Sequence, residues 1–531
     1  MTTLTGFSRI ARFILRRDRV RLTIWVVAIT LMTVASAASL PAVYPDQASI
    51  DNYVALFGDN PALIAFAGPG YGFENPNLGL VLVNETQLNA MIALALMGIF
   101  LVTRHTRAEE ESERADLVRS NVVGRHAPTA AAAIVIGGAN VLVGVLCGAG
   151  FIALDYQVTG SVALAASVTC AGLLFAGIAA VAAQLTGTSR ATLGLASSVL
   201  GIAFALRAIG DIADNGLSWL SPIGWAQAVQ AYAGERWWAL GLCVAAALAL
   251  LVGAFWLSTR RDLGAGILPA RLGNARAKGW MTLPVGFAFR LQRGALLGWM
   301  IALFFLGFIY GSIANDIEAM IEENEFAAEM FSAQGGATLT DQFLAAALAQ
   351  LALIAGACGI ASALRLATEE GAGRAEPILA GPVDRRLWAG SHVVMAAAGS
   401  LVAVAAGGLG VGLSYALVAG DAGQIPRLIG AALSTYPAVL ILTGIAVVLF
   451  GAFPSIARAA WAALAIAFVA SFFGDLFKLP EWTLRISPFE HVPGLPAEDL
   501  SVLPLLVLTA IAMGLFSFGM WRFRARDLRT E

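Results

Sequence analysis

Charge is what this sequence has least of. Only 13% of its 531 residues are Asp, Glu, Lys or Arg, whereas 58% are hydrophobic. A soluble globular protein carries about 25% charged residues, which keep its surface hydrated. The composition therefore excludes a soluble globular chain and a disordered or fibrous one, and it predicts an integral membrane protein.

Residues that carry out chemistry are scarce as well. The four cysteines lie singly inside apolar runs and the four histidines are scattered, so neither a disulfide framework nor a metal site is predicted. Only two lysines occur, Lys278 and Lys478, and neither follows the glycine-rich turn that cradles ATP phosphates. HExxH and GxSxG motifs are also missing. We expect no catalytic residue, no metal and no cofactor bound by this chain, which points away from an enzyme.

Twelve apolar stretches are long enough to cross a bilayer, for which about 20 residues are needed. They predict an all-α integral membrane protein with twelve transmembrane helices. The predicted spans are residues 22–40, 86–103, 130–154, 161–184, 191–209, 238–257, 295–313, 342–363, 390–419, 428–452, 456–474 and 500–521.

The 33 basic residues come in bursts that alternate along these spans. If the N-terminus is cytoplasmic, nearly all of them lie on the cytoplasmic side, as the positive-inside rule requires. The exceptions are Arg207, Arg236, Arg427, Lys478 and Arg485. Both termini are therefore predicted to be cytoplasmic. Because the charge follows membrane topology, we expect membrane lipids and no nucleic acid among the partners.

The charge pattern occurs twice along the chain. RRDRVRLTIW, which ends at Trp25, matches RLQRGALLGW, which ends at Trp299, and EEESERADLV later matches EEGAGRAEPI. Chance similarity between apolar helices would align Ala and Leu but not charged residues in register. The chain is thus predicted to contain two halves, residues 1–270 and 271–531. Each half has six spans, an even number, so the halves are parallel repeats with the same orientation.

The matching charges lie in two cytoplasmic loops, the first loop (104–125) and the second loop (365–385). A single charged loop is usually only a solvated surface, but the recurrence of one pattern indicates a docking site. The candidate docking residues are Glu109, Glu110, Arg114, Asp116 and Arg125 in the first loop, and Glu369, Glu370, Arg374, Glu376 and Arg385 in the second.

The local sequence predicts that the two loops differ. Glu110 and Arg114 are expected to be i,i+4 partners on one helix of the first loop. Gly371, Gly373 and Pro377 predict that the second loop is less helical.

The predicted span interiors contain no Asp, Glu, Lys or Arg apart from Arg207 near one end. Proton-coupled carriers keep titratable groups inside the bundle, so this emptiness argues for an energy source outside the chain. On the outer side, the segments SIDNYVALF and DIEAMIEENEFAAEMF predict amphipathic surface helices. Ser221-Pro222 and Ser487-Pro488 predict helix starts, with Ser as N-cap and Pro at the first helical position.

These residues together resemble the permease subunits of ABC-2 type exporters, in the tandem-fused form of actinobacterial multidrug and polyketide-antibiotic exporters of the tetronasin type. The motifs that carry the resemblance are the basic segment before the first span, the EExxxRA[DE] loops and the Ser-Pro elements. The resemblance implies a type V exporter-like pseudo-dimer of two ABC-2-like halves. It further implies inner "elbow" helices at 5–21 and 281–294, and short re-entrant outer helices at 212–230 and 476–492.

The resemblance also implies a function. The two loops would dock onto two copies of a separate ABC ATPase subunit, which bind ATP and Mg, in a bacterial plasma membrane. The complex would export amphipathic or hydrophobic small molecules: drugs, antibiotics or lipids. The alternative that the sequence leaves open is a stand-alone, proton-coupled twelve-helix efflux carrier. The candidate residues of the substrate path are Asn89, Met91, Phe100, Gln342, Phe343, Gln350, Trp461, Phe468 and Phe472.

Overall fold

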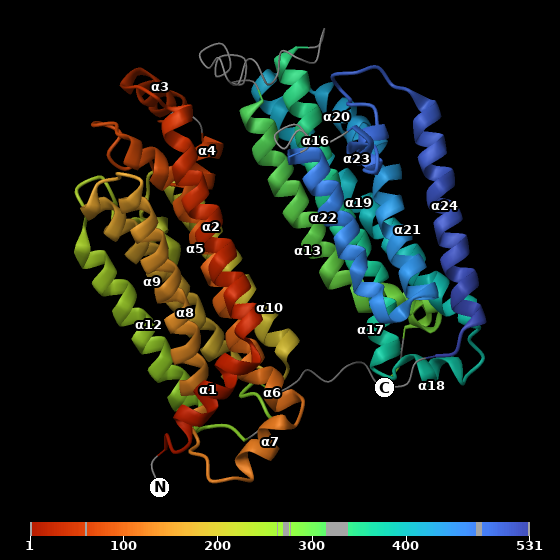
Figure 1. The fold of residues 1–531 in the computed structure, drawn as a ribbon, viewed down its shortest axis with the longest axis horizontal. Helices are drawn as coiled ribbons and strands as arrows, with labels where there is room; N and C mark the ends of the chain where they lie inside the picture. The colour runs from red at the N-terminus through yellow and green to blue at the C-terminus, as the bar shows by residue number, and fades with distance from the viewer. Residues whose placement is uncertain are drawn as a thin grey trace. The chain divides into compact units, whose positions relative to one another are not determined.

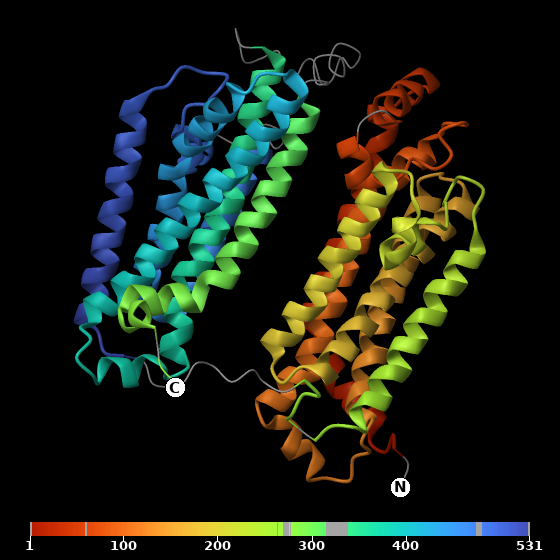
Figure 2. The same ribbon diagram turned by 180° about the vertical axis from the view of Figure 1, so that it is seen from behind.

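The computed structural model describes residues 3–58, 61–262, 264–268, 276, 278–314, 338–473 and 481–528. All regular secondary structure in these ranges is helical (Figures 1 and 2). Twelve helical segments are long and apolar enough to span a membrane. The prediction of an all-α protein with twelve transmembrane helices is confirmed. The chain divides into two compact units, Met1–Gly273 and Asn274–Glu531.

The first unit is a bundle in which α5 and α9 are the most enclosed spans. Buried polar side chains connect its elements, since Gln87 donates to the Ser167 hydroxyl at 3.0 Å and the Ser161 and Tyr232 hydroxyls are hydrogen-bonded to each other at 2.7 Å. Such hydrogen bonds hold apolar helices together where lipid offers no hydrophobic driving force. The six spans are α2 (Arg19–Val43), α5 (Leu78–His105), α8 (Ala127–Ala153), α9 (Val158–Leu185), α10 (Ser189–Ile212) and α12 (Trp237–Ser258).

The second unit relies on small residues to bring its first and third spans together. A side chain added at Gly307 would overlap the backbone oxygen of Gly407, and one added at Gly410 would overlap that of Phe304. Close backbone contact of this kind is typical of membrane helix pairs. The spans are α13 (Pro284–Ile313), α16 (Leu339–Ala363), α19 (Arg385–Ala419), α20 with α21 (Gln424–Ser434 and Tyr436–Ala452), η3 with α22 (Pro454–Ala459 and Ala460–Phe473) and α24 (Val502–Ala525).

The two units start differently. In the first, α1 (Phe7–Arg17) is a separate basic helix, because Asp18 leaves helical geometry with φ -107° and ψ 18° before α2 begins. In the second, a short turn η2 (Gly279–Thr282) precedes α13, which runs without interruption through the whole basic segment. The elbow expected at 281–294 is therefore not a separate helix but the first part of α13, which Figure 2 shows lying across the rest of that helix.

The end of the first unit that was predicted to face outward carries the expected short helices. α3 (Gln47–Gly58) buries Ile50, Tyr53 and Phe57 on one face, which confirms the amphipathic helix predicted there. α4 (Pro61–Ala67) follows it. The matching acidic helix of the second half falls within 315–337, outside the described residues.

Ser-Pro starts a helix in both units. Ser221 accepts hydrogen bonds from the backbone N–H groups of Ile223 and Gly224 at the start of α11 (Pro222–Gln227), and Pro222 occupies the first helical position. Ser487 caps η4 (Pro488–His491) in the same way. The predicted helix starts are confirmed at both positions. The short turn η1 (Gly216–Leu220) and the helix α23 (Glu481–Leu484) complete these outer segments.

Candidate functional site

Both loops fold as a pair of short helices. The first loop contains α6 (Arg107–Glu111) and α7 (Arg114–Arg119), and the second contains α17 (Arg365–Gly371) and α18 (Ala375–Leu379). The prediction that the second loop is less helical is wrong.

The reason lies in where the helix-breaking residues of the second loop sit. Gly373 occupies the turn between α17 and α18 with φ +67°, and Glu113 adopts φ +59° at the matching turn of the first loop. Glycine suits that turn better than glutamate because it has no side chain to clash. Pro377 lies in the first turn of α18, where its missing N–H would have no helical partner.

The expected pairing of Glu110 with Arg114 is also wrong. α6 ends at Glu111 and α7 begins at Arg114, so the two residues do not share a helix. The Glu110 carboxylate turns toward the bundle instead. It contacts the Arg107 guanidinium at 2.6 Å and accepts two hydrogen bonds from Arg261, at 2.6 and 2.7 Å.

Arg261 anchors the first loop to the ends of two spans. It lies three residues after the end of α12, and its Nε donates to the Gln184 side chain at the end of α9, at 2.8 Å. Arg125, at the far end of the loop, donates to the backbone oxygen of Arg261 at 3.3 Å. We call Glu110 with Arg261 and Arg125 the first anchor.

The second loop has a matching anchor. Glu370 on α17 accepts two hydrogen bonds from Arg526, at 2.6 and 2.7 Å, and Arg526 follows α24 as Arg261 follows α12. Arg385 donates to the backbone oxygen of Arg526 at 2.8 Å. The Arg526 guanidinium also lies over the Phe450 and Phe523 rings, at 5.0 and 5.1 Å from their centroids. These three polar residues form the second anchor.

The two anchors explain why the charges recur in the sequence. Glu110 and Glu370 have side chains only 10% and 4% exposed, and each one makes a paired, charge-assisted contact with an arginine. These carboxylates therefore hold the loops in place and do not present themselves at the surface. Sequence reasoning missed Arg261 and Arg526 as site residues, although the repeated Arg-Asp-Leu after the last span of each half was a usable signal.

The outward-facing groups of the loops are Arg114 and Asp116 in the first and Arg374 and Glu376 in the second, all of them exposed. Arg374 differs from Arg114 because it bonds to Glu369 at 2.7 and 3.2 Å, and this hydrogen bond raises the pKa of Arg374. The structure thus divides eight of the ten predicted docking residues into exposed tips and inner anchors, and Glu109 and Glu369 belong to neither group. Their docking role stays a prediction.

The neighbouring acidic residues also connect differently in the two units. Glu109 pairs with Arg17 of α1 at 2.6 Å, so the first loop is held by the basic helix. Glu369 instead pairs with Arg365 and Arg374 of its own loop, each at 2.7 Å.

Asp18, between α1 and α2, extends the ionic network of the first unit. It is buried and contacts Arg104 and His105 at 2.8 Å each. Burial alone raises the pKa of Asp18, but the hydrogen bond from Arg104 and the charges around it outweigh burial and hold the pKa below its ordinary value.

A neutral cluster takes the place of this ionic one in the second unit. Gln292 corresponds to Asp18 in the predicted repeat, and it accepts a hydrogen bond from the Ser362 hydroxyl at 2.6 Å. Its amide nitrogen lies 3.2 Å from His392 Nδ1.

The predicted substrate-path residues fall into different environments. Met91 and Gln342 are buried within their units, whereas Phe100, Trp461 and Phe468 are exposed on theirs. The remaining candidates with described side chains are partly buried: Asn89, Phe343 and Gln350, the last of which accepts from the Tyr310 hydroxyl at 2.6 Å. The Phe472 side chain lies outside the described residues. None of these roles is tested, and all of them stay predictions.

The predicted span interiors contained no charged residue apart from Arg207, but the structure also places Glu85 inside a spanning helix. α5 begins at Leu78, eight residues before the predicted span, so Glu85 lies within it and accepts from the Tyr53 hydroxyl at 3.2 Å. This first part of the helix lies between the polar N-cap Asn77 and the charged Glu85, and these residues interrupt the apolar run from which the span was predicted.

In α10, Arg207 is fully buried and lies 3.5 Å from Asp211. Its guanidinium donates to the backbone oxygens of Ile64 and Ala65 in α4, at 3.2 and 2.5 Å. This arginine therefore connects α4 to the span, and it lies near one end of α10, as the sequence predicted.

Comparison with known proteins extends over the whole chain. A family model described as the C-terminal domain of the multidrug efflux system permease Rv1217c matches residues 281–524. The chain is 40% identical over 530 residues to the multidrug efflux system permease protein Rv1217c of Mycobacterium tuberculosis (strain ATCC 25618 / H37Rv). The alignment covers 99% of this chain and 96% of the relative. Together with twelve candidate spans, this similarity places the chain in the family of multidrug efflux system permeases represented by Rv1217c.

Proposed function

We propose that this chain is the membrane-spanning subunit of an ATP-driven exporter that moves amphipathic or hydrophobic compounds out of a bacterial cell. Two copies of a separate ABC ATPase subunit would hydrolyse ATP with Mg, one docked on each loop. The termini and both loops would lie in the cytoplasm. The relative's description as a multidrug efflux permease supports the substrate class.

The observation that carries the proposal is the pair of matched anchors. Each loop is fixed by a largely buried glutamate to an arginine within three residues of the end of the sixth span of its unit, with distances of 2.6–2.7 Å in both. A loop that only joins two spans needs no such fixation. A loop that passes a push from a partner to the spans does need it, because a loosely held loop would absorb the movement.

The exposed tips supply the docking groups in this account. Asp116 and Glu376 occupy matching positions in the first turns of α7 and α18, and both are exposed. Docking through exposed charges governs the rate and specificity of association more than its strength. We therefore expect the tips to select the ATPase and the anchors to transmit its movement.

The test is co-expression of the tagged chain with candidate ABC ATPase subunits, followed by purification and assay of drug-stimulated ATP hydrolysis. Two ATPase subunits should copurify per chain. Asp116→Lys and Glu376→Lys should each weaken this association. The matched control is Asp499→Lys, which reverses an exposed acidic residue between η4 and α24, at the opposite end of the spans. If no ATPase copurifies, or if Asp499→Lys weakens association as much, the docking assignment fails.

One observation favours a second candidate function, a proton-coupled efflux carrier. Glu85 places a carboxylate within a span, and such groups serve as proton sites in carriers. Under this alternative Glu85→Gln abolishes transport driven by a pH gradient in vesicles that contain no ATPase subunit. Under our proposal such vesicles show no gradient-driven transport at all.

A further inference from the structure

A cavity of about 660 Å³ lies beside the first loop, entirely within the first unit. α1, the end of α5, α6, α7 and the start of α8 form its walls. Its volume falls in the range of about 300–1,000 Å³ that is typical of small-ligand sites. Apolar side chains line the α1 side, with Ile10 and Phe13 among them, and Val122 and Val123 line the opposite side.

The charged groups of this cavity leave a positive excess. Its two carboxylates are already neutralised, that of Glu109 by Arg17 at 2.6 Å and that of Glu110 in the first anchor. Arg9 and Arg114 also line the cavity, and neither has an acidic partner among the residues that the structure describes. Two uncompensated guanidinium groups are suited to a phosphate, which they bind with paired hydrogen bonds.

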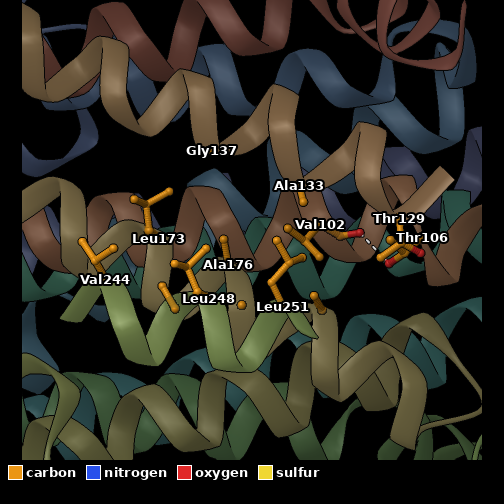
Figure 3. Close-up of a pocket in the computed structure, with 13 residues that line it drawn as sticks. Val102, Thr106, Thr129, Ala133, Gly137, Leu173, Ala176, Val244, Leu248 and Leu251 are labelled. Atoms are coloured by element: carbon orange, nitrogen blue, oxygen red, sulfur yellow. Dashed lines mark hydrogen bonds between the residues drawn. The ribbon is translucent and has the colours of Figure 1, made fainter. Parts of the chain in front are cut away.

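An apolar groove of about 140 Å³ adjoins the cavity (Figure 3). Thr106 and Thr129 line both spaces and mark the point where they meet. From there the groove runs between α8, α9 and α12 toward Leu173 and Val244, as Figure 3 shows. Apart from the two threonines its lining is made of Val, Ala, Gly and Leu, and the exposed side chain of Leu248 lies on its α12 side. Such a groove fits a hydrocarbon chain.

We infer that an anionic phospholipid occupies these two spaces together. Its phosphate lies between Arg9 and Arg114, and one acyl chain lies in the groove along α12. The level is right for a headgroup, because the cavity lies where α2, α5 and α8 reach their ends and α1 exposes both Phe13 and arginines, as interfacial helices do. The lipid connects α1 to α7 and so controls how firmly the first loop is held.

The second unit does not offer the same pair of unpaired arginines. Leu283 is the counterpart of Arg9 in the repeat, and Arg374, the counterpart of Arg114, is already bonded to Glu369 at 2.7 and 3.2 Å. One specific lipid per chain is therefore expected. This inference does not rest on the proposed function, because lipid binding is measured on the permease alone.

Native mass spectrometry of the purified full chain tests the site. The chain is titrated with phosphatidylglycerol, with phosphatidylethanolamine of the same acyl chains, and with inorganic phosphate. Phosphatidylglycerol should bind at one site, and more tightly than the other two ligands. Arg9→Gln and Arg114→Gln should each weaken it about fivefold, and the double variant about thirtyfold. Arg12→Gln removes the same charge from the same helix but outside the cavity, and it should bind as the wild type does.

The groove is tested by a second pair of variants. Gly137→Leu places a side chain against Leu173 in the groove, whereas Gly138→Leu, one residue further on, points into open space. Only the first should weaken phosphatidylglycerol binding. The inference is overturned if phosphatidylethanolamine binds equally well or if Arg12→Gln weakens binding as much as Arg9→Gln does. It is also overturned if phosphate binds as tightly as the lipid and Gly137→Leu has no effect, which would indicate a site for free anions.

Discussion

Replacement of Glu110 by glutamine isolates the contribution of the first anchor. Glutamine keeps the size of the side chain but removes the charge that holds Arg107 and Arg261. Both arginines are nearly enclosed, with side chains 1% and 7% exposed. Two guanidinium nitrogens of Arg107 already lack a hydrogen-bond partner, so its remaining contact with Glu110 matters all the more.

The expected magnitude follows from this burial. Removing one partner of a buried ion pair costs about 3–5 kcal/mol. The glutamine oxygen can still accept a hydrogen bond, so we expect about 2–3 kcal/mol, which is roughly a 30- to 150-fold increase in the population of a released loop. This loss of stability should be confined to the first loop, because Glu110 and Arg261 lie at the ends of the spans and not in their cores.

Hydrogen exchange combined with ATP hydrolysis measures both effects. Amides of α6 and α7 should exchange roughly 30-fold or more faster in Glu110→Gln, while those of α9 stay protected. In the same variant, drug-stimulated ATP hydrolysis by the assembled complex should decrease. Glu370→Gln should produce the same change in α17 and α18 only. Glu113→Gln, an exposed substitution in the same loop, is the matched control and should change neither quantity.

Two results would refute this reasoning. If exchange in α6 and α7 is unchanged in Glu110→Gln, the pair does not hold the loop. If exchange rises but drug-stimulated hydrolysis stays at the wild-type level, a firmly held loop is not needed for coupling. A charge swap, Glu110→Arg with Arg261→Glu, should restore part of the protection that either single reversal removes, because the pair can form again in the opposite sense.

Three further predictions concern other parts of the fold. Gly410→Leu should separate α13 from α19 and destabilise the second unit by about 1–3 kcal/mol or more, measured by thermal unfolding in detergent, whereas Gly430→Leu, which meets open space, should not. Because the pKa of Asp18 is lowered in the folded state, its contribution to stability is complete above the ordinary pKa and is lost as the pH falls through the lowered one. The difference in melting temperature between the wild type and Asp18→Asn should therefore be constant above about pH 5 and should shrink only below about pH 4. Arg207→Gln should release α4 from α10 and increase proteolysis near residues 61–67, with Arg236→Gln on the same predicted side as the control.

The sequence was sufficient to predict the number and the approximate limits of the spans, because long apolar runs leave few alternatives in a membrane. It was also sufficient to find the two loops, since paired charges in register do not arise from apolar helices by chance. The helical turns at Ser221 and Ser487 followed from local rules of capping that need no tertiary information.

The errors came where a partner lay far away in the chain. Glu110 was assigned to its near neighbour Arg114, whereas its partner Arg261 lies 151 residues further on. Glu85 was left outside the predicted span because its charge ended the apolar run. In the structure it lies within α5 and accepts a hydrogen bond from the Tyr53 hydroxyl of α3. Gly373 was treated as a helix breaker when it serves a turn that both loops require. The first two errors reflect tertiary contacts that local propensity does not contain, and the third reflects a turn whose place in the loop the sequence alone did not fix.

The two units differ in how their loops are held. The first loop is connected to α1 through Arg17 and Glu109, whereas the second is closed on itself through Glu369. The ionic cluster at Asp18 has a neutral counterpart at Gln292. We therefore expect substitutions in α1 to affect the first loop only, which hydrogen exchange on Arg17→Gln would test against Arg293→Gln.

The central claim is that energy for transport comes from outside this chain. It is tested most directly by drug uptake into inverted membrane vesicles that contain the chain with or without its ATPase subunits. The account predicts uptake that requires both ATP and the ATPase subunits, and that persists when an uncoupler removes the proton gradient. Uptake without any ATPase subunit, abolished by the uncoupler and by Glu85→Gln, would contradict it.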